Sequence, residues 1–440
     1  MRNITTLLAG ASALILSTAA LADNHGVNAL QTKALQDDVA YDIIEGMTTE
    51  VGPRQAGTQQ EARARVWSVD KLKSLGFENV RDEAFMMPTW VRGEETAAVV
   101  APYPQKLMVT ALGNSASTGA KGITAEIAYF DSLEAMKAVP DGSLTGKIAF
   151  VTHKMHRTQD GSSYSAFGPI RWVGPSIASQ KGASAYVIKS IGTDNYRNPD
   201  ADNLERMIKL AQKSGKPVTM NLVLTPKNIG QQQSGNVIAE VVGRDPSLPM
   251  ILIACHLDSW DLATGAFDDA AGCGIITAAA KNIKDHGQPL RTIRLLWAGA
   301  EEVGIWGGKA YRDAHRDKKH AIAMESDFGA DNIWRVEFTL PDEAKTVADE
   351  IAASLLNLGI GRSGGQAGGG ADIGPIIADG NLAIIDLQQD GSRYFDLHHT
   401  PDDTLDKIDP EQVRQNVAAW TTVLSIIANS DADFTMPVKK

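Results

Sequence analysis

Residues 250–258, MILIACHLD, form an apolar run that ends in a histidine and an aspartate. A continuous apolar run of this length is typical of a strand that is buried on both faces of a sheet. A helix rich in alanine, expected from Asp269 to Ile283, follows the strand. Strand and helix continue to alternate toward the C-terminus. This alternation predicts an α/β fold with a mostly parallel sheet and helices on both faces.

The chain divides into two parts of different composition. Residues 115–233 contain strand-like segments of their own and lack a cluster of carboxylates and histidines. We therefore expect one α/β domain made of residues 23–114 and 234–440, interrupted by an inserted, mainly β domain at residues 115–233.

The first 22 residues have the pattern of a secretory signal peptide. Arg2 is the only charged residue before Asp23, an apolar stretch covers residues 7–16, and small residues at 20 and 22 suit a cleavage site. About ten apolar residues are too few to cross roughly 30 Å of hydrocarbon. The sequence thus predicts an exported protein, periplasmic or secreted, without a membrane anchor.

Composition and charge narrow the function classes. The chain has 440 residues, of which 43% are hydrophobic and 22% charged, as in folded globular proteins. The net charge of −11 argues against nucleic acid as a partner, because nucleic-acid binding requires a basic surface. The two cysteines, Cys255 and Cys273, do not form a disulfide framework. Buried free thiols are the favoured interpretation, and a bridge between them stays open.

Residues that bind metals follow the expected strands one after another. The pairs are His256 with Asp258, Asp268 with Asp269, Glu301 with Glu302, Glu325 with Asp327, and His398 with His399. Each pair alone is typical of a surface turn or a helix cap. Together they meet at the carboxyl ends of parallel strands, where α/β sheets bind ligands. Carboxylates and imidazoles are zinc ligands, and this inventory suffices for two metal ions.

Five segments carry a resemblance to a known family. They are CHLDSWD (255–261), GAFDDAAG (265–272), WAGAEEVGIWG (297–307), MESDFG (324–329) and HHTPDDT (398–404). They resemble metallopeptidase family 28, the co-catalytic zinc aminopeptidases, and within it the carboxypeptidase Q subgroup, also called plasma glutamate carboxypeptidase. The turn at residues 51–57, VGPRQAG, is similar as well. The inserted block at 115–233 resembles the protease-associated domain that several members carry.

The resemblance implies a role for each residue of these segments. His256 and Asp327 would hold one Zn²⁺, Glu302 and His399 would hold the other, and Asp268 would bridge the two. Glu301 would be the general base, and Asp258 would orient the His256 ring without binding the metal itself. His398 is a candidate for contact with a developing oxyanion. Independently of the resemblance, Asp372 is a candidate for a substrate ammonium and Tyr394 for a residue lining the pocket, and a turn-stabilising role of Asp372 stays open.

These roles predict a secreted di-zinc metallo-exopeptidase that hydrolyses short peptides, either dipeptides or N-terminal residues, through an activated water. Two alternatives stay open. One is a non-catalytic, receptor-like ectodomain that binds peptides on the same fold, which the complete ligand set and Glu301 disfavour. The other is an acyltransferase like glutaminyl cyclase, which shares the fold and uses one zinc. Side-chain preference, the choice between dipeptidase and aminopeptidase action, and a homodimer also stay open.

Overall fold

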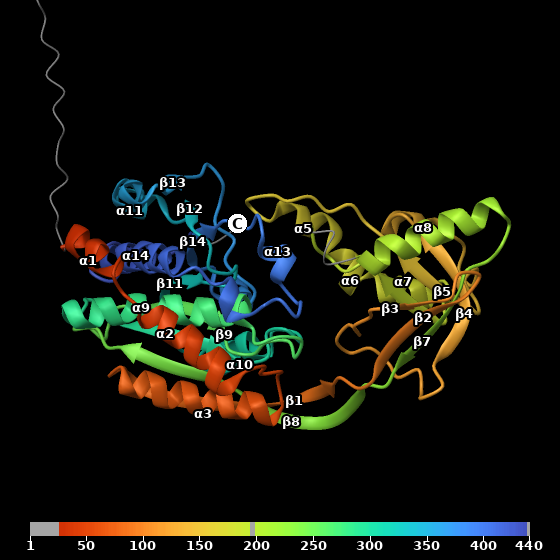
Figure 1. The fold of residues 1–440 in the computed structure, drawn as a ribbon. Coiled ribbons are helices and arrows are strands. Elements are labelled where there is room, and N and C mark those ends of the chain that lie inside the picture. The colour runs from red at the N-terminus through yellow and green to blue at the C-terminus, as the bar shows by residue number, and fades with distance from the viewer. Residues whose placement is uncertain (1–25, 194–198, 438–440) are drawn as a thin grey trace, which may run out of the picture.

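The computed structural model describes residues 26–193 and 199–437. The chain forms two lobes, which are joined by the long antiparallel strands β1 (Glu78–Val91) and β8 (Lys227–Val241) (Figure 1). The expected signal peptide, residues 1–22, lies outside the described residues. Within the described part of the chain, no helix has both the length and the apolar character needed to cross a membrane.

The first lobe is built on an eight-stranded sheet with the order β1-β8-β10-β9-β11-β14-β12-β13. Its other strands are β9 (Met250–His256), β10 (Ile293–Ala298), β11 (His320–Glu325), β12 (Ile333–Thr339), β13 (Gly361–Arg362) and β14 (Ala383–Gln389). The four central strands, β10, β9, β11 and β14, run parallel to one another. Antiparallel pairs flank them, β8 on one side and β12 on the other. The α/β fold predicted from sequence is confirmed, with the parallel part confined to the centre.

Both faces of this sheet are buried, as the apolar run of β9 predicts. Ile251, Ile253 and Cys255 belong to the large apolar cluster on one face, whereas Leu252 and Ala254 belong to a smaller cluster on the other. Successive strand residues point to opposite faces, so an uninterrupted apolar run needs a cover on each side.

Different helices supply the two covers. The large cluster includes residues of α1 (Val27–Ala34), α2 (Val39–Gly46), α9 (Ala271–His286), α11 (Lys345–Leu355) and α14 (Pro410–Ile427). The smaller one includes residues of α10 (Trp306–Ala314) and α12 (Gly374–Gly380). Helix α3 (Gln59–Ser74) packs along β1 and β8. The sheet is thereby fixed as a rigid platform whose strand ends remain available for a site.

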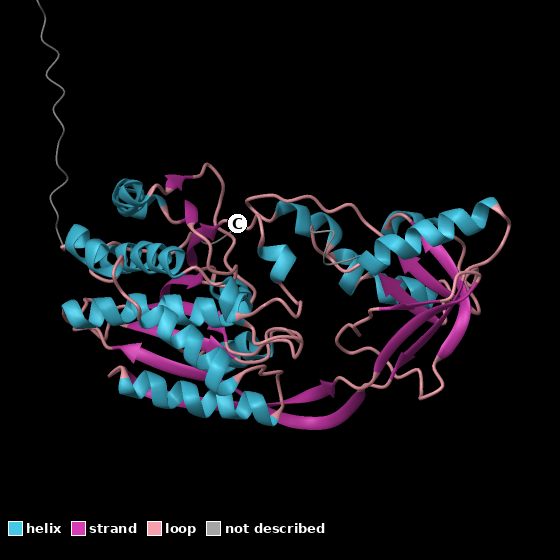
Figure 2. Cartoon of the chain, in the orientation of Figure 1, coloured by secondary structure: helices cyan, strands magenta, loops and turns pink. Residues whose placement is uncertain are grey.

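The second lobe contains a six-stranded sheet with the order β3-β2-β7-β4-β5-β6. Its strands are β2 (Glu95–Ala101), β3 (Gln105–Leu107), β4 (Ile123–Phe130), β5 (Lys147–Val151), β6 (Ala185–Ile188) and β7 (Thr219–Leu224). This sheet starts earlier in the chain than the expected insertion at 115–233, because β2 pairs with β7. Helices α4 (Leu133–Ala138), α5 (Ser162–Phe167), α6 (Pro169–Trp172), α7 (Gly174–Gln180) and α8 (Pro199–Lys213) accompany it (Figure 2). The lobe is therefore mixed α/β, not mainly β as expected.

The lobes also meet away from the connecting strands, where α5 and α6 approach the short helix α13 (Tyr394–Leu397) (Figure 1). The ring of Tyr164 on α5 stacks on Phe395 of α13, with centroids 4.4 Å apart. Arg157 forms an ion pair with Asp396, and Gln159 donates to Asp390 at 2.9 Å. The second lobe thus braces the segment that leads directly into His398 and His399.

Candidate metal centre

The predicted ligands meet around Asp268. Nε2 of His256 lies 3.2 Å from Oδ1 of Asp268 and 3.3 Å from Oδ1 of Asp327. On the other side, Nε2 of His399 lies 3.2 Å from Oδ2 of Asp268 and 2.8 Å from Oε2 of Glu302. Two groups of three side chains result, each with one histidine and one carboxylate of its own, and they share Asp268.

Sheet topology explains why residues up to 143 positions apart converge. Strands β10, β9 and β11 lie side by side and parallel, so their carboxyl ends share one edge. His256 is the last residue of β9, Asp327 follows β11 by two residues, and Glu302 follows β10 by four. The loop after α13 brings His399 to the same edge, with a left-handed backbone at φ 57°.

The carboxylates of this centre lack the proton donors that would satisfy them. Buried oxygens of Asp268 (Oδ2), Glu302 (Oε1) and Asp327 (Oδ1) receive no well-aligned hydrogen bond within the described structure. Such orphaned, converging oxygens are costly in a protein interior unless a cation neutralises them. The donor set of two imidazoles and three carboxylates, in two groups that share one member, fits a pair of zinc ions.

Burial and neighbouring charges act on these groups in opposite directions. Burial favours the neutral form of Asp268, but hydrogen bonds with His256 and His399 outweigh it and hold the pKa of Asp268 well below its usual value. Burial raises the pKa of Glu302 well above normal, and the charge of Asp268 adds to that rise. Asp268, which the two groups share, is therefore the carboxylate of the centre most strongly kept ionised.

Asp258 connects His256 with Glu301. Its backbone carbonyl accepts a hydrogen bond from Nδ1 of His256 at 3.0 Å, while its carboxylate stands 3.8 Å from that nitrogen. Oδ1 of Asp258 accepts from the backbone N–H of Glu301 at 2.9 Å. Asp258 therefore holds the His256 ring with Nε2 facing Asp268 and Asp327, and it also fixes the backbone of Glu301.

Glu301 stands beside the ligands without joining either group. Burial raises its pKa well above the usual value, and the nearby carboxylates of Asp327 and Glu302 raise it further against the opposing charge of His256. A carboxylate with a raised pKa, next to a metal centre, is suited to take up and deliver protons.

The three candidate substrate residues lie at different places. The hydroxyl of Tyr394 donates to Oδ1 of Asp268 at 3.2 Å. The ring of His398 stacks on that of His399, with centroids 3.5 Å apart, and its Nε2 lies 3.8 Å from Oδ2 of Asp268. Asp372 is fully buried in the loop before α12, and neither of its carboxylate oxygens has a hydrogen-bond partner in the described structure.

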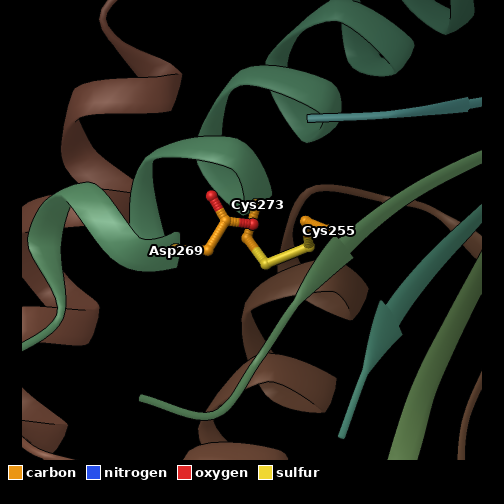
Figure 3. Close-up of side chains that lie close together, drawn as sticks. All are labelled: Cys255, Asp269 and Cys273. Carbon is orange, nitrogen blue, oxygen red and sulfur yellow. A yellow bond between two sulfur atoms is a disulfide. The ribbon is translucent and has the colours of Figure 1, made fainter. Parts of the chain in front are cut away.

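The interpretation of the cysteines as free thiols was wrong. Cys255 and Cys273 form a disulfide that joins the end of β9 to the start of α9, and both residues are fully buried (Figure 3). The sequence left this bridge open because 18 residues separate the two cysteines. Only the packing of α9 on the sheet brings them together, directly beside His256.

Asp269 is neither a surface-turn residue nor an exposed helix cap, the roles that are typical of such an aspartate pair taken alone. Asp269 is fully buried, and its carboxylate lies beside the disulfide (Figure 3). Its Oδ2 accepts from the backbone N–H of His256 at 3.1 Å and its Oδ1 from that of Gly272 at 3.0 Å. Asp268 and Asp269 have non-helical dihedrals, so the helix proper begins only at Ala271. Asp269 thus ties the end of β9 to the start of α9.

Sequence reasoning missed two further residues that organise the centre. Arg54 is fully buried and donates to the carbonyls of Leu257, Thr264 and Gly265 at 2.5–2.9 Å. Asp403 accepts from the backbone N–H of Phe267 at 2.6 Å. Both residues lie within the motifs quoted above, so the motifs could have marked them as candidates. Their roles could not be predicted, because their partners are backbone atoms, which no motif reveals.

A shallow pocket adjoins the centre. It is lined by Trp260, Leu262, Ala263 and Gly265 together with Asp268, Glu302, His399, Thr400 and Asp403. Members of both ligand groups line this pocket together with apolar residues, so an atom held there would lie against Asp268, Glu302 and His399.

Comparisons with known proteins agree with this geometry. The profile of peptidase family M28 matches residues 236–424. Carboxypeptidase Q of Bos taurus is 31% identical over 89% of this chain and 85% of its own length. The crystal structure of a peptidase M28 precursor from Shewanella amazonensis superposes with a TM-score of 0.89, at 41% identity over 94% of this chain and 98% of that one. A zinc aminopeptidase from Bacillus subtilis, at 20% identity over 90% of this chain and 95% of its own, has the same fold with a TM-score of 0.64. The chain therefore belongs to peptidase family M28, as its five motifs predicted.

Proposed function

We propose that this chain is an exported exopeptidase with two zinc ions, which hydrolyses dipeptides or removes residues from short peptides. The observation that carries the proposal is the pair of ligand groups around Asp268, each with a histidine 3.2 Å from one of its two oxygens. Relatives named carboxypeptidase Q and zinc aminopeptidase support both the peptide substrate and the metal.

His256, Asp327 and Asp268 would hold one zinc, and Glu302, His399 and Asp268 the other. When bound, zinc would supply Lewis acidity, which polarises a substrate carbonyl and makes water easier to deprotonate. Side chains of this protein would orient the ligands and the substrate and would transfer protons. Tyr394, through its hydrogen bond to Asp268, would keep the shared carboxylate oriented.

Glu301 would take the proton of the attacking water and later deliver it to the leaving amine. Its raised pKa suits both tasks, and the hydrogen bond from its backbone to Asp258 fixes its position. His398 would donate to the developing oxyanion from its place against His399. Asp372, with both oxygens unpartnered, would receive the ammonium of the substrate.

Two features outside the centre complete the proposal. The pattern of residues 1–22 supports export, and a buried disulfide is typical of proteins from oxidising compartments. The second lobe would be an inserted protease-associated domain, which closes one side of the substrate site through its contact with α13.

The change Glu301→Gln tests this function. It keeps the size of the side chain and all ligands, so both zinc ions should remain while turnover falls about 10²–10⁴-fold. Elemental analysis gives the zinc content, and a panel of dipeptides and longer peptides gives the rate. The control is Glu61→Gln, a buried glutamate on α3 that lies outside the ligand groups, which should keep near-normal turnover.

Three results would contradict the proposal. Near-normal turnover of Glu301→Gln with full zinc would remove Glu301 as the base. A wild-type protein that binds peptides without cleaving them would favour the receptor-like alternative. One zinc per chain with cyclisation of N-terminal glutamine would favour the acyltransferase.

A further inference from the structure

A second pocket, with a volume of about 210 Å³, lies at the other end of the sheet from the metal centre. The ends of α9 and α14 and the loop after β8 contribute to it. Strand β8 ends at Val241, opposite Ile293 at the start of β10, so the pocket adjoins the amino ends of the parallel strands. Helix α9 begins beside the metal centre and ends at the pocket, and its 16 residues span about 24 Å (Figure 1). The pocket is therefore a separate site.

Apolar residues from the buried core line part of this pocket. Leu30 of α1 is 3% exposed, and Ile283 of α9 is 2% exposed. Ser425 of α14 also lines the pocket and is buried, and its hydroxyl donates to the carbonyl of Thr422 at 2.8 Å. A ligand that contacts this part of the pocket gains most from an apolar group, because that group leaves water.

Two basic side chains, Arg244 and His286, are exposed at the rim. Nη1 of Arg244 donates to the carbonyl of Gln288 at 3.3 Å, and Arg244 forms no ion pair with any described residue. The side chain of His286 has no hydrogen bond or ion pair within the same part of the chain. A guanidinium has five N–H donors in a fork that matches a carboxylate, so Arg244 retains most of its donors for an anionic group.

The same pocket adjoins the C-terminal ends of two helices, α9 and α14. The last carbonyl groups of a helix lack partners within it and carry a partial negative charge. The N–H of Gly287 donates to the carbonyl of Ile283 at 3.2 Å, whereas the carbonyls of Asp285 and His286 accept no hydrogen bond from the described residues. These helix ends favour a cationic group, such as an ammonium, close to the carboxylate that Arg244 would bind.

We propose that this pocket binds a free α-amino acid with an apolar side chain, such as leucine. The carboxylate would bind Arg244 and His286, the ammonium group would face the helix ends, and the apolar side chain would contact Leu30 and Ile283. Pockets for drug-sized ligands measure about 300–1,000 Å³, so a pocket of 210 Å³ suits a single amino acid better than a peptide. This inference goes beyond the proposed function, because binding here requires neither zinc nor hydrolysis.

Calorimetry with leucine on the zinc-loaded protein tests the inference. Arg244→Ala and Arg244→Lys are compared with the wild type and with Arg316→Ala, which removes the same charge from an exposed ion pair with Asp313. N-acetylleucine lacks the ammonium group, leucinamide lacks the carboxylate, and inorganic phosphate lacks both the ammonium and the apolar group. Hydrolysis of alanylalanine by each variant shows whether the metal centre is intact.

We expect Arg244→Ala to weaken leucine binding about 10- to 100-fold, because hydrogen bonds to a charged group are lost. Arg244→Lys should keep part of the affinity, and Arg316→Ala should keep all of it. N-acetylleucine and leucinamide should each bind at least about tenfold more weakly than leucine. The values of kcat and KM for alanylalanine should be unchanged in all three variants.

Three results would overturn the inference. The first is a wild type that does not bind leucine, and the second is leucine binding that Arg244→Ala leaves unchanged, which would place leucine at the metal centre. In the second case, a lower stability of Arg244→Ala would show that Arg244 only balances the helix dipoles. The third is phosphate binding as tight as that of leucine, which would make the pocket a general anion site. Failure of the wild type to hydrolyse any peptide would contradict the proposed function and leave the calorimetric comparison valid.

Discussion

His256 and His399 lie on opposite sides of Asp268, but the backbone holds them in different ways. His256 belongs to the β9–β10 ladder, opposite Ala298, and its side chain is 1% exposed. Asp269 accepts its backbone N–H, and the disulfide of Cys255 adjoins it. We refer to His256 and Asp327 as the strand half of the centre.

The other half, His399 with Glu302, rests on loops. The side chain of His399 is 15% exposed, and its backbone has the left-handed φ of 57° that non-glycine residues rarely adopt. Ala300, two residues before Glu302, has φ 60°. Both segments depend on surrounding contacts to hold these conformations, and for His399 those contacts include Arg171 of the second lobe. The strand half is thus preorganised by the sheet, whereas the loop half also depends on how the lobes meet.

Removing Asp268, the residue that the two halves share, should have the largest effect on zinc binding. We expect Asp268→Ala to weaken both proposed zinc sites together, because one carboxylate would serve both and would offset the repulsion between two dications about 3.5–4 Å apart. His256→Ala and His399→Ala should each empty mainly one site. Chelator titration with elemental analysis measures this, and the loss should exceed the ~10–100-fold typical of residues that only orient ligands. Retention of two zinc ions by Asp268→Ala would rule out bridging.

Removal of the disulfide should have a smaller effect on zinc retention, and this effect should differ between the strand half and the loop half. In the double variant Cys255→Ala/Cys273→Ala, an 18-residue link is opened, and the free energy of unfolding should fall by about 3 kcal/mol. Zinc held by the strand half should be retained about tenfold less well, because β9 and α9 carry His256 and Asp268. Zinc held by the loop half should change less.

Zinc retention by each half is measured separately by introducing the two cysteine substitutions into the His399→Ala and His256→Ala variants. Leu355→Ala, at the fully buried end of α11, controls for lost stability alone at a cost of about 2–5 kcal/mol. Equal zinc retention in the Leu355→Ala protein and the cysteine variant would show that the disulfide stabilises the fold without positioning the ligands.

The smallest effect concerns pH and lies outside both halves. Burial raises the pKa of Glu61 from 4.5 to about 7, against the opposing charge of Arg65. Between these values the folded protein binds a proton that the unfolded chain has released, so stability decreases as pH rises from about 4.5 to 7. The slope from this group is at most about 1.4 kcal/mol per pH unit.

Glu61→Gln should remove this component, which denaturant titrations at pH 5, 6, 7 and 8 would reveal. Because Glu61 lies outside the ligand groups, the same variant should change the pH dependence of the free energy of unfolding and leave the pH dependence of zinc retention unchanged. An unchanged slope in Glu61→Gln would show that the pKa of Glu61 is not raised in the folded protein.

Sequence reasoning succeeded where a local pattern has a single physical meaning. The apolar run before His256 could only be a strand covered on both faces, and parallel strand ends share an edge. The convergence of His256, Asp268, Glu302, Asp327 and His399 followed from this, and the structure brings all five together. The predicted start of the insertion, residue 115, lies after β2 and β3, which belong to the sheet of the second lobe. No local pattern reveals this, because the pairing of β2 with β7 joins segments over 100 residues apart.

The α/β class and the family could be predicted from the sequence alone, because periodicity and motifs are properties of short segments. Three contacts are visible only in the folded chain: Cys255 pairs with Cys273, Asp269 holds β9 against α9, and Arg171 reaches His399 from the other lobe. These contacts join residues that no local pattern relates. They exist because packing of α9 on the sheet, and of the second lobe on α13, sets distances that the chain order leaves free.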